Sequence, residues 1–361
     1  MANYDELKTK LKKYMAIEAM SRYEEPVVEE LKKNIKSNKL EFSRDGFGSL
    51  IIKNKPKVKN APKVMIAAHM DEVGYLIRSI EDNGNLLVST VGGVWPVAVI
   101  GTKAKVVTNR ENKAIYGIFG HTSIHILETE KRLKAPTEKE LFVDCGFMSK
   151  QEAIDFGIEV GDRVYMSGET IEMPNNLIGG KAMDNRAGVT VIDLLANRIK
   201  DMDLPNETYI VGTVQEEVGT RGAKTSVSII NPDVAFAIDT GASHDTTGCI
   251  KGTPVLGKGA ALLIQDRAVI TDPKLVNMLV DIAKKHNIPA YKYIAEGGGT
   301  DGAELQYGQG GVPTITLSLP QRYLHSPIGV CSLVDLQAAL DLITEFLKVF
   351  DTKMLNELKS K

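Results

Sequence analysis

Hydrophobic residues follow two kinds of pattern, and these alternate over much of the chain. Short continuous apolar runs, such as residues 64–68, are typical of strands buried on both faces of a sheet. Apolar positions three or four residues apart, as in residues 185–200, are typical of helices that bury one face. Strands that alternate with helices predict an α/β fold, with a mostly parallel sheet and helices on both of its faces.

The same patterns place the individual elements. The expected strands are residues 64–68, 208–214, 234–238, 290–294 and 313–319, and the expected helices are 185–200, 273–285 and a closing helix from 333. Nearer the N-terminus, Ser21 and Glu24 have the spacing of a capping box, and Pro26 suits the first turn of the helix that follows. Glycines punctuate an expected hairpin around residues 45–52.

The pattern changes between residue 74 and about residue 166. This segment is rich in Val, Ile, Gly and Thr, turn signals recur in it, and only one helix is expected, near residues 150–156. It interrupts the α/β alternation on either side. We therefore expect an inserted, β-rich domain at 74–166 within a discontinuous larger domain formed by 1–73 and 167–361.

Composition and charge narrow the possible partners and compartments. The 361 residues are 43% hydrophobic, and the net charge of -2 offers no field that would attract nucleic acid or an anionic membrane. The N-terminus lacks the apolar segment of a secretory signal, and no apolar run approaches the roughly 18 residues of a membrane helix. The three cysteines are far apart, so neither a disulfide framework nor a cysteine zinc site is expected. A cytoplasmic protein is the prediction.

Metal-binding side chains lie close to the ends of the predicted strands. In open α/β sheets, ligands bind beyond the carboxyl ends of the strands, so side chains that follow different strands can converge there. Taken singly, such residues have simpler explanations: Asp184 could be a helix N-cap, and a lone histidine is usually only hydrogen-bonded. These explanations do not account for the whole set, which is His69, Asp71, Asp184, Glu216, Glu217, Asp239 and His325.

Imidazole and carboxylate ligands suit zinc, cobalt or manganese. Two such ions about 3.5–4 Å apart need one carboxylate that bridges them. His69, Asp184 and Asp239 could hold one ion. Asp184, Glu217 and His325 could hold the other. Asp184 would then be the bridge, and each subunit would bind two divalent metal ions.

Two acids remain for other roles. In an extended chain neighbouring side chains point in opposite directions, so Glu216 would face away from the ion that Glu217 holds. A carboxylate beside a metal site that binds no ion is suited to act as a general base. Asp71 lies two residues from His69 and could fix the orientation of its imidazole.

The motifs around these residues resemble a known family. They are His69-x-Asp71 and the segments 183–186 (Met-Asp-Asn-Arg), 216–219 (Glu-Glu-Val-Gly), 238–240 (Ile-Asp-Thr) and 323–326 (Tyr-Leu-His-Ser). In this order, and together with Gly298-Gly299-Thr300-Asp301, they resemble the dinuclear-metal aminopeptidases, which include glutamyl aminopeptidases and the tetrahedral TET peptidases. The resemblance extends over nearly the whole chain.

The resemblance implies a zinc-peptidase-like catalytic domain that carries the metal ligands assigned above, with Glu216 as base and Asp71 as supporting acid. The reaction would release the N-terminal residue of short peptides, by attack of a hydroxide that bridges the two metals. The inserted segment would be a small β-barrel used for oligomerisation, and the protein would be a homo-oligomer, often a dodecamer in this family. Residues 241–245 depart from the family pattern, so the preferred first residue stays open, as does any role of His244.

Three other functions remain alternatives. A carboxypeptidase or deacylase on the same scaffold would need a cationic group to bind a substrate carboxylate. A glycosidase would need two carboxyl groups facing each other about 5–9.5 Å apart, which adjacent Glu216 and Glu217 do not naturally provide. A non-catalytic scaffold would be indicated by a missing ligand, and every ligand type that the metal site needs is present.

Overall fold

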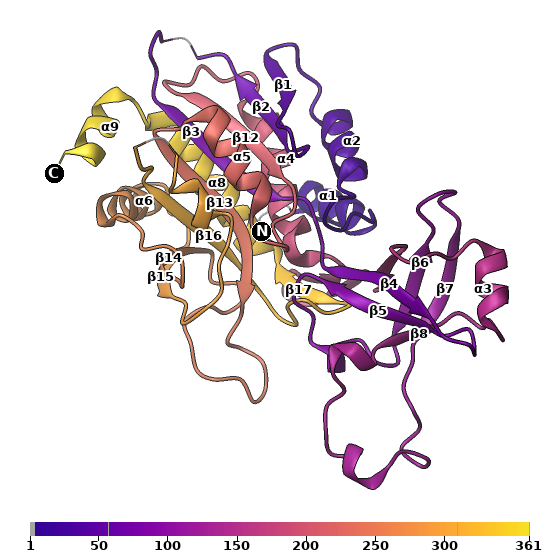
Figure 1. Ribbon diagram of the computed structural model, residues 1–361. Coiled ribbons are helices and arrows are strands. Elements are labelled where there is room, and N and C mark those ends of the chain that lie inside the picture. The colour runs from indigo at the N-terminus through magenta and orange to yellow at the C-terminus, as the bar shows by residue number, and fades with distance from the viewer. Residues whose placement is uncertain (1–3, 57, 309, 361) are drawn as a thin grey trace.

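The computed structural model describes residues 4–56, 58–308 and 310–360. Figure 1 shows a larger α/β body with a small β-barrel beside it. Among the described residues, none of the helices combines the length and the apolar character that crossing a membrane requires.

An eight-stranded mixed sheet forms the centre of the body. Its strand order is β1 (Leu40–Arg44), β2 (Leu50–Asn54), β12 (Glu207–Thr213), β3 (Lys63–His69), β13 (Val234–Ala242), β16 (Thr314–Gln321), β14 (Ala260–Gln265) and β15 (Ala290–Ile294). The four central strands β12, β3, β13 and β16 are parallel, and β14 is parallel to β15. The pairs β1–β2, β2–β12 and β14–β16 are antiparallel. The expected parallel sheet is therefore present at the centre, where the central strands are covered on both faces.

Helices cover both faces of this sheet, as the alternation of elements predicted. One face packs against α1 (Asp5–Met15), α2 (Glu25–Asn34), α4 (Met183–Ile199), α6 (Pro273–Lys285) and α8 (Leu333–Val349). The other face packs against α5 (Arg221–Ile230) and α7 (Gly302–Leu305). Strand β3 shows the alternation that this requires, because Ile66 belongs to the first apolar core and Met65 and Ala67 belong to the second. The chain ends with α9 (Thr352–Lys359).

The segment expected to be an inserted β-rich unit forms a closed barrel. Its strand order is β4 (Gly74–Ile80), β5 (Leu86–Val91), β8 (Phe142–Asp144), β7 (Ala114–Phe119), β6 (Lys103–Val107) and β9 (Arg163–Met166). The expected helix is α3 (Lys150–Phe156), and three short 3₁₀ helices lie at Pro96–Ala98, Thr129–Lys131 and Glu138–Glu140. Tyr75, Phe119 and Val164 belong to a separate apolar core inside the barrel. The segment between β7 and β8 extends away from the barrel (Figure 1).

A three-stranded antiparallel sheet joins the two strands that follow the barrel in the chain to a third strand near the C-terminal end of the body. It consists of β10 (Ile171–Met173), β11 (Leu177–Gly180) and β17 (Gly329–Ser332), and its strand order is β10-β11-β17. α4 begins shortly after β11, and β17 leads directly into α8. The pairing of β11 with β17 therefore brings the start of α4 close to the segment that follows β16.

Some local predictions are wrong, and each has a physical reason. Ser21 and Glu24 do not form a capping box, because Glu24 caps α2 without a side-chain hydrogen bond and Ser21 Oγ donates to Asp71 Oδ2 instead. The buried carboxylate of Asp71 needs hydrogen-bond donors, and this need outweighs the hydrogen bond that Ser21 could make as a helix cap. Strand β13 continues past the predicted end at residue 238, because it stays paired with β16 up to Ala242. Asp239 therefore lies within a strand.

Candidate metal centre

The structure brings all seven predicted site residues to one edge of the sheet. His69 ends β3, and Glu216 and Glu217 follow β12. His325 follows β16, and the other three residues come from the segment after β3, the start of α4 and strand β13: Asp71, Asp184 and Asp239. Because β12, β3, β13 and β16 are adjacent and parallel, their carboxyl ends meet at one edge.

Asp184 lies between two groups of ligands. His69 Nε2 is 3.0 Å from Asp184 Oδ1 and 3.3 Å from Asp239 Oδ1. On the other side, His325 Nε2 is 3.2 Å from Asp184 Oδ2 and 3.5 Å from Glu217 Oε2. In each group, the ligand atoms of the three residues lie within 4.8 Å of one another. The two oxygens of Asp184 thus face two different histidines, which is the arrangement a bridging carboxylate requires.

The charges at this site fit divalent cations. Burial raises the pKa of Glu217 to about 8, and repulsion from Asp184 adds to the effect. Burial also raises the pKa of Glu216 well above its usual range. Glu217 Oε1 is buried and has no hydrogen-bond partner within the described part of the chain. Buried carboxylates that repel one another in this way become stable as anions when a cation lies between them.

The imidazole of His69 is held in one orientation. Its Nδ1 lies 3.0 Å from the backbone carbonyl oxygen of Asp71 and 3.5 Å from Asp71 Oδ1. Nδ1 therefore carries the hydrogen and donates it to Asp71. Nε2 is then the ring nitrogen that faces Asp184 and Asp239, and it is the atom that would bind a metal ion in place of a proton. The expected partnership between His69 and Asp71 is present, and the backbone of Asp71 makes the shorter contact.

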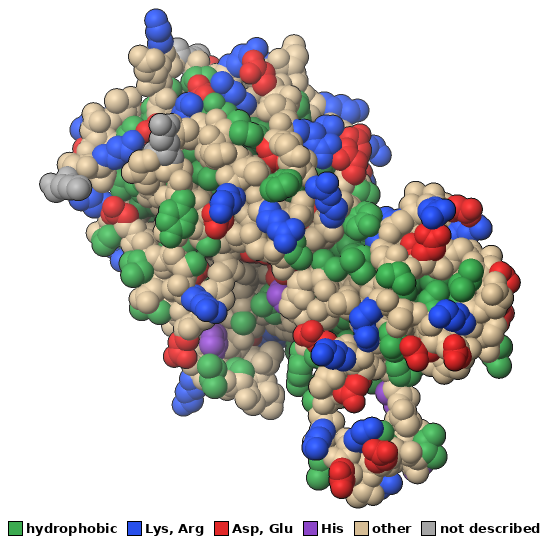
Figure 2. Space-filling view, in the orientation of Figure 1, with side chains coloured by type: hydrophobic (Ala, Val, Ile, Leu, Met, Phe, Trp, Pro, Cys, Tyr) green, Lys and Arg blue, Asp and Glu red, His purple; other side chains and the backbone are tan. Residues whose placement is uncertain are grey.

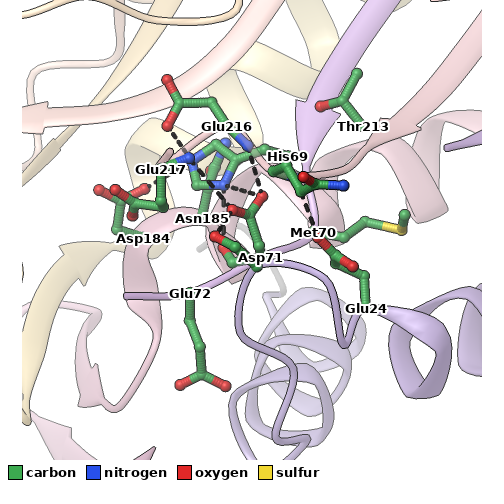
Figure 3. A network of polar contacts seen from close by, with 12 residues as sticks. Glu24, His69, Met70, Asp71, Glu72, Asp184, Asn185, Thr213, Glu216 and Glu217 are labelled. Carbon is green, nitrogen blue, oxygen red and sulfur yellow. Dashed lines mark hydrogen bonds and ion pairs between the residues drawn. The ribbon is translucent and has the colours of Figure 1, made fainter. Parts of the chain in front are cut away.

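The carboxylate of Asp71 connects three separate segments. It is fully buried and accepts hydrogen bonds from Ser21 Oγ at 2.6 Å, from the Glu216 amide at 3.0 Å and from the Glu217 amide at 3.2 Å. Burial opposes its ionisation, but the hydrogen bond and charge of His69, with these donors, hold the pKa of Asp71 below its usual value. Figure 3 shows the carboxylate beneath His69 and Glu216, whereas Glu72 points away from the cluster.

Glu216 and Glu217 face different nearest partners, but their carboxylates stay close together. One ligand atom from each of His69, Glu216 and Glu217 lies within 4.8 Å of the others, so these three residues form a third group that could hold a metal ion. Glu217 Oε2 faces His325, whereas Glu216 Oε2 is 4.0 Å from His69 Nε2. The backbone here is not extended, since Gln215 has a φ of 56° and a turn follows β12. The turn, whose Glu216 and Glu217 amides donate to Asp71, therefore sets the direction of the two side chains.

Asp184 does not cap its helix. The N-cap of α4 is Ala182, without a side-chain hydrogen bond, and Asp184 and Asn185 have non-helical backbone angles. Asn185 satisfies the neighbouring backbone instead, because its Nδ2 donates to the Ile238 carbonyl and its Oδ1 accepts from the Gly188 amide, both at 2.8 Å. The carboxylate of Asp184 is therefore free to face the two histidines.

Sequence reasoning assigned no role to Asp301, although it belongs to one of the motifs that carry the family resemblance. Asp301 is 2% exposed, and its Oδ2 accepts a hydrogen bond from the Thr213 hydroxyl. Burial raises the pKa of Asp301 to about 7, and the carboxylates of Asp239 and Asp71 add to this effect. Its Oδ1 is buried without a hydrogen-bond partner in the described chain. Asp301 thus belongs to the acidic cluster.

The barrel also reaches the site, as its place in the chain directly after His69 and Asp71 allows. A Cβ atom built on Gly92, in the turn after β5, would lie 2.6 Å from Val73 Cγ1 and 3.2 Å from Glu217 Cβ. One built on Gly93 would lie 3.7 Å from His325 Nδ1. Figure 2 shows the surface hollowed between the body and the barrel, with a histidine side chain in the hollow.

Comparisons with known proteins agree with this architecture. The family model for the M42 glutamyl aminopeptidases matches residues 48–342. The glutamyl aminopeptidase of Lactococcus lactis subsp. cremoris is 35% identical over 358 residues, which are 98% of this chain and 99% of that protein. An aminopeptidase structure from the archaeon Desulfurococcus kamchatkensis has a TM-score of 0.92 at 35% identity and covers 99% of this chain and 98% of its own.

A second solved structure adds information on assembly. The TET1 peptidase of Pyrococcus horikoshii, which can assemble into a tetrahedron or a large octahedral shell, has a TM-score of 0.84 at 31% identity. The match covers 95% of this chain and 100% of that one. Sequence and structure therefore agree over nearly the full length, and the chain belongs to the M42 glutamyl aminopeptidase family of peptide-bond hydrolases.

Proposed function

We propose that this protein is an aminopeptidase that uses two divalent metal ions to release the first residue of short peptides. The observation that carries the proposal is the position of Asp184, whose Oδ1 faces His69 and whose Oδ2 faces His325. Asp239 completes the first ligand group and Glu217 completes the second. These nitrogen and oxygen donors suit zinc or cobalt best, and they also suit manganese.

When bound, the two ions would supply positive charge that polarises the scissile carbonyl, stabilises the oxyanion and acidifies the attacking water. Glu216 accepts the proton of the water at its carboxylate and passes it to the leaving amine. Asp71 binds the backbone amides of Glu216 and Glu217 and so keeps the base in place. Asp71 is therefore a positioning residue.

The charge of the site favours an aminopeptidase over a carboxypeptidase. Carboxylates surround the proposed centre, and they attract the cationic amino terminus of a peptide and repel its carboxylate. Two buried cations nearby, Lys181 and Arg186, are paired with Glu72, at 2.8 and 3.2 Å. Neither is therefore free to bind a substrate carboxylate.

Metal analysis tests this proposal directly. We expect wild-type protein to hold about two divalent ions per chain, and we expect a chelator to abolish the cleavage of aminoacyl p-nitroanilides until zinc, cobalt or manganese is restored. Asp184→Ala is expected to lose both ions, because one carboxylate serves both. Amino-acetylated substrates should remain uncut. Full activity of protein shown by elemental analysis to be metal-free, or cleavage of blocked substrates, would contradict the proposal.

We also propose that the barrel segment, residues 74–166, joins subunits into a large homo-oligomer, with a dodecamer as the expected form. Large apolar side chains are exposed on it, including Ile126 at 80% and Leu133 at 98%. Exposed apolar surface of this kind usually marks an interface. An enclosed active site would restrict substrates to short peptides. A reducing cytoplasm is the proposed location, and the three unpaired cysteines support it.

A further inference from the structure

A cavity of about 340 Å³ lies beside the candidate metal centre. Its lining includes Thr240, the residue directly after Asp239, and Thr300, the residue directly before Asp301. A volume of this size is enough for a small ligand or one long side chain, since ligand pockets span roughly 300–1,000 Å³. The cavity is therefore placed to receive the side chain of the residue that the enzyme releases.

The wall of the cavity nearest the sheet is largely apolar. Leu263, which is 2% exposed, pairs in register with Tyr293, and both line the cavity. Ser318, also in the lining, pairs with Asp239, so these side chains share the face of the sheet that carries the proposed ligand. A Cβ on Gly241 would lie 2.5 Å from Ser318 Oγ, so only glycine fits at this point of the wall.

A buried acid lies in the same lining. Asp266 follows β14 and is only 7% exposed. Its Oδ1 accepts hydrogen bonds from the amides of Ala268 and Val269, both at 2.7 Å. Its Oδ2 is buried and has no hydrogen-bond partner among the described residues. Asp266 therefore adds a buried negative charge to the wall of the cavity, and this charge attracts a cation and repels an anion.

The other charged groups of the lining reinforce this preference. Glu296 lines the cavity on an exposed loop and carries a second negative charge. None of the described lining residues is Lys or Arg. The one histidine of the lining, His244, has its Nδ1 at 3.0 Å from the Ile250 carbonyl oxygen, so this nitrogen is already engaged. The cavity therefore combines an apolar wall with negative charge.

We propose that this cavity binds the side chain of the first residue of the substrate and selects lysine and arginine. The aliphatic stem of such a side chain would lie along Leu263 and Tyr293, and its charged end would lie in the field of Asp266 and Glu296. A neutral residue would leave Asp266 unpaired, and an acidic one would be repelled. This proposal rests on the proposed aminopeptidase function, and it assigns Asp266 as the specificity-determining residue.

The test compares aminoacyl p-nitroanilides of Lys, Arg, Leu and Glu with the metal-loaded enzyme. We expect kcat/KM for Lys and Arg to exceed that for Leu by about tenfold or more, with Glu the poorest substrate. Asp266→Asn keeps the Oδ1 acceptor that holds Ala268 and Val269, and it should lower the Lys-to-Leu ratio of kcat/KM by about 10- to 100-fold. Glu296→Gln should lower the ratio by a few-fold. Asp281→Asn, an equal change of charge at an exposed position of α6, should leave it unchanged.

Calorimetric titration with the free amino acids gives a second measurement that needs no turnover. L-Lysine should bind the wild-type enzyme more tightly than L-norleucine, and Asp266→Asn should remove this difference. A wild-type preference for Leu or Glu, or an unchanged Lys-to-Leu ratio in Asp266→Asn, would overturn the assignment while leaving the aminopeptidase function intact. Loss of a Glu preference in His244→Gln would likewise overturn it. Failure of the metal-loaded enzyme on all four substrates would instead contradict the proposed function.

Discussion

The α/β body and the barrel differ in the kinds of side chain that they bury and expose. At its sheet edge the body buries ionisable groups such as His69, Asp71, Asp239 and Asp301, and it also buries Arg186. In residues 74–166, the described buried polar side chains are only Thr108 and Asp162. This segment instead contributes ten of the 21 exposed large hydrophobic side chains of the described chain: Trp95, Val97, Tyr116, Ile118, Ile124, Ile126, Leu133, Met148, Ile154 and Val160.

This difference shows how the two regions divide their tasks. Buried charges destabilise a fold unless they are paired, so their concentration at one sheet edge indicates chemistry. Exposed apolar side chains are not buried in the isolated subunit, and their burial against another subunit favours association. The two regions meet at Gly92, which packs against Glu217. The barrel therefore borders the proposed active site as well as carrying the proposed interface.

The largest effect on the charged region is expected for Glu216→Gln. Loss of the base should lower kcat by about two orders of magnitude or more, while the metal content stays close to wild type because Glu216 is not a proposed ligand. Steady-state kinetics and elemental analysis on the same preparation check both parts. Asp184→Ala is the matched variant that loses metal. If Glu216→Gln lost as much metal as Asp184→Ala, the assigned roles would be wrong.

Asp71→Asn should have the next largest effect. In this variant the side-chain NH2 group would face one of the two backbone N–H groups that now donate a hydrogen bond to the carboxylate. The turn that carries Glu216 and Glu217 would therefore shift. We expect a decrease in kcat/KM of about 10- to 100-fold. Ser21→Ala removes a single hydrogen bond to the same carboxylate and should have a much smaller effect. Equal losses in both variants would argue against the positioning role of Asp71.

Gly92→Ala tests the contact between the two regions. Gly92 has a φ of 80°, and a Cβ there would come within 2.6 Å of Val73 Cγ1. The displacement should reach Glu217 and reduce kcat/KM by about tenfold, since small shifts of catalytic groups have large effects on rate. Gly101→Ala is the control, because Gly101 also has a positive φ of 78° but a Cβ added there would meet nothing within 4 Å. Similar kinetics in the two variants would show that the barrel does not influence the site.

The smallest effect on catalysis is expected for changes on the barrel surface. The double variant Ile126→Ser and Leu133→Ser should yield smaller species by light scattering, while kcat on a dipeptide changes by only a few-fold. Ile229→Ser, at a 60% exposed position of α5 in the body, should leave the assembly intact. If light scattering showed that the wild-type protein is a monomer at working concentration, the proposed oligomer would be contradicted. The proposed role of the barrel as an interface would be contradicted with it.

The sequence by itself determined most of the fold and the composition of the site. The patterns at residues 150–156, 273–285 and 290–294 predicted α3, α6 and β15 with their observed bounds. These predictions were possible because a helix or strand that buries one face repeats its apolar residues at a fixed spacing along the sequence. The positions of His69, Asp184 and the other predicted site residues near element ends were visible for the same reason, and the order of their motifs indicated the family.

Only the tertiary structure decided which of these atoms meet. Ser21 looked like a helix cap, but it donates to Asp71, 50 residues further along the chain. The two oxygens of Asp184 face His69 and His325, which belong to different strands and loops. Asp266 carried no signal in the sequence, because its importance comes from lining a cavity beside the site. Contacts of this kind depend on strand order and register, which a local period of apolar residues does not specify.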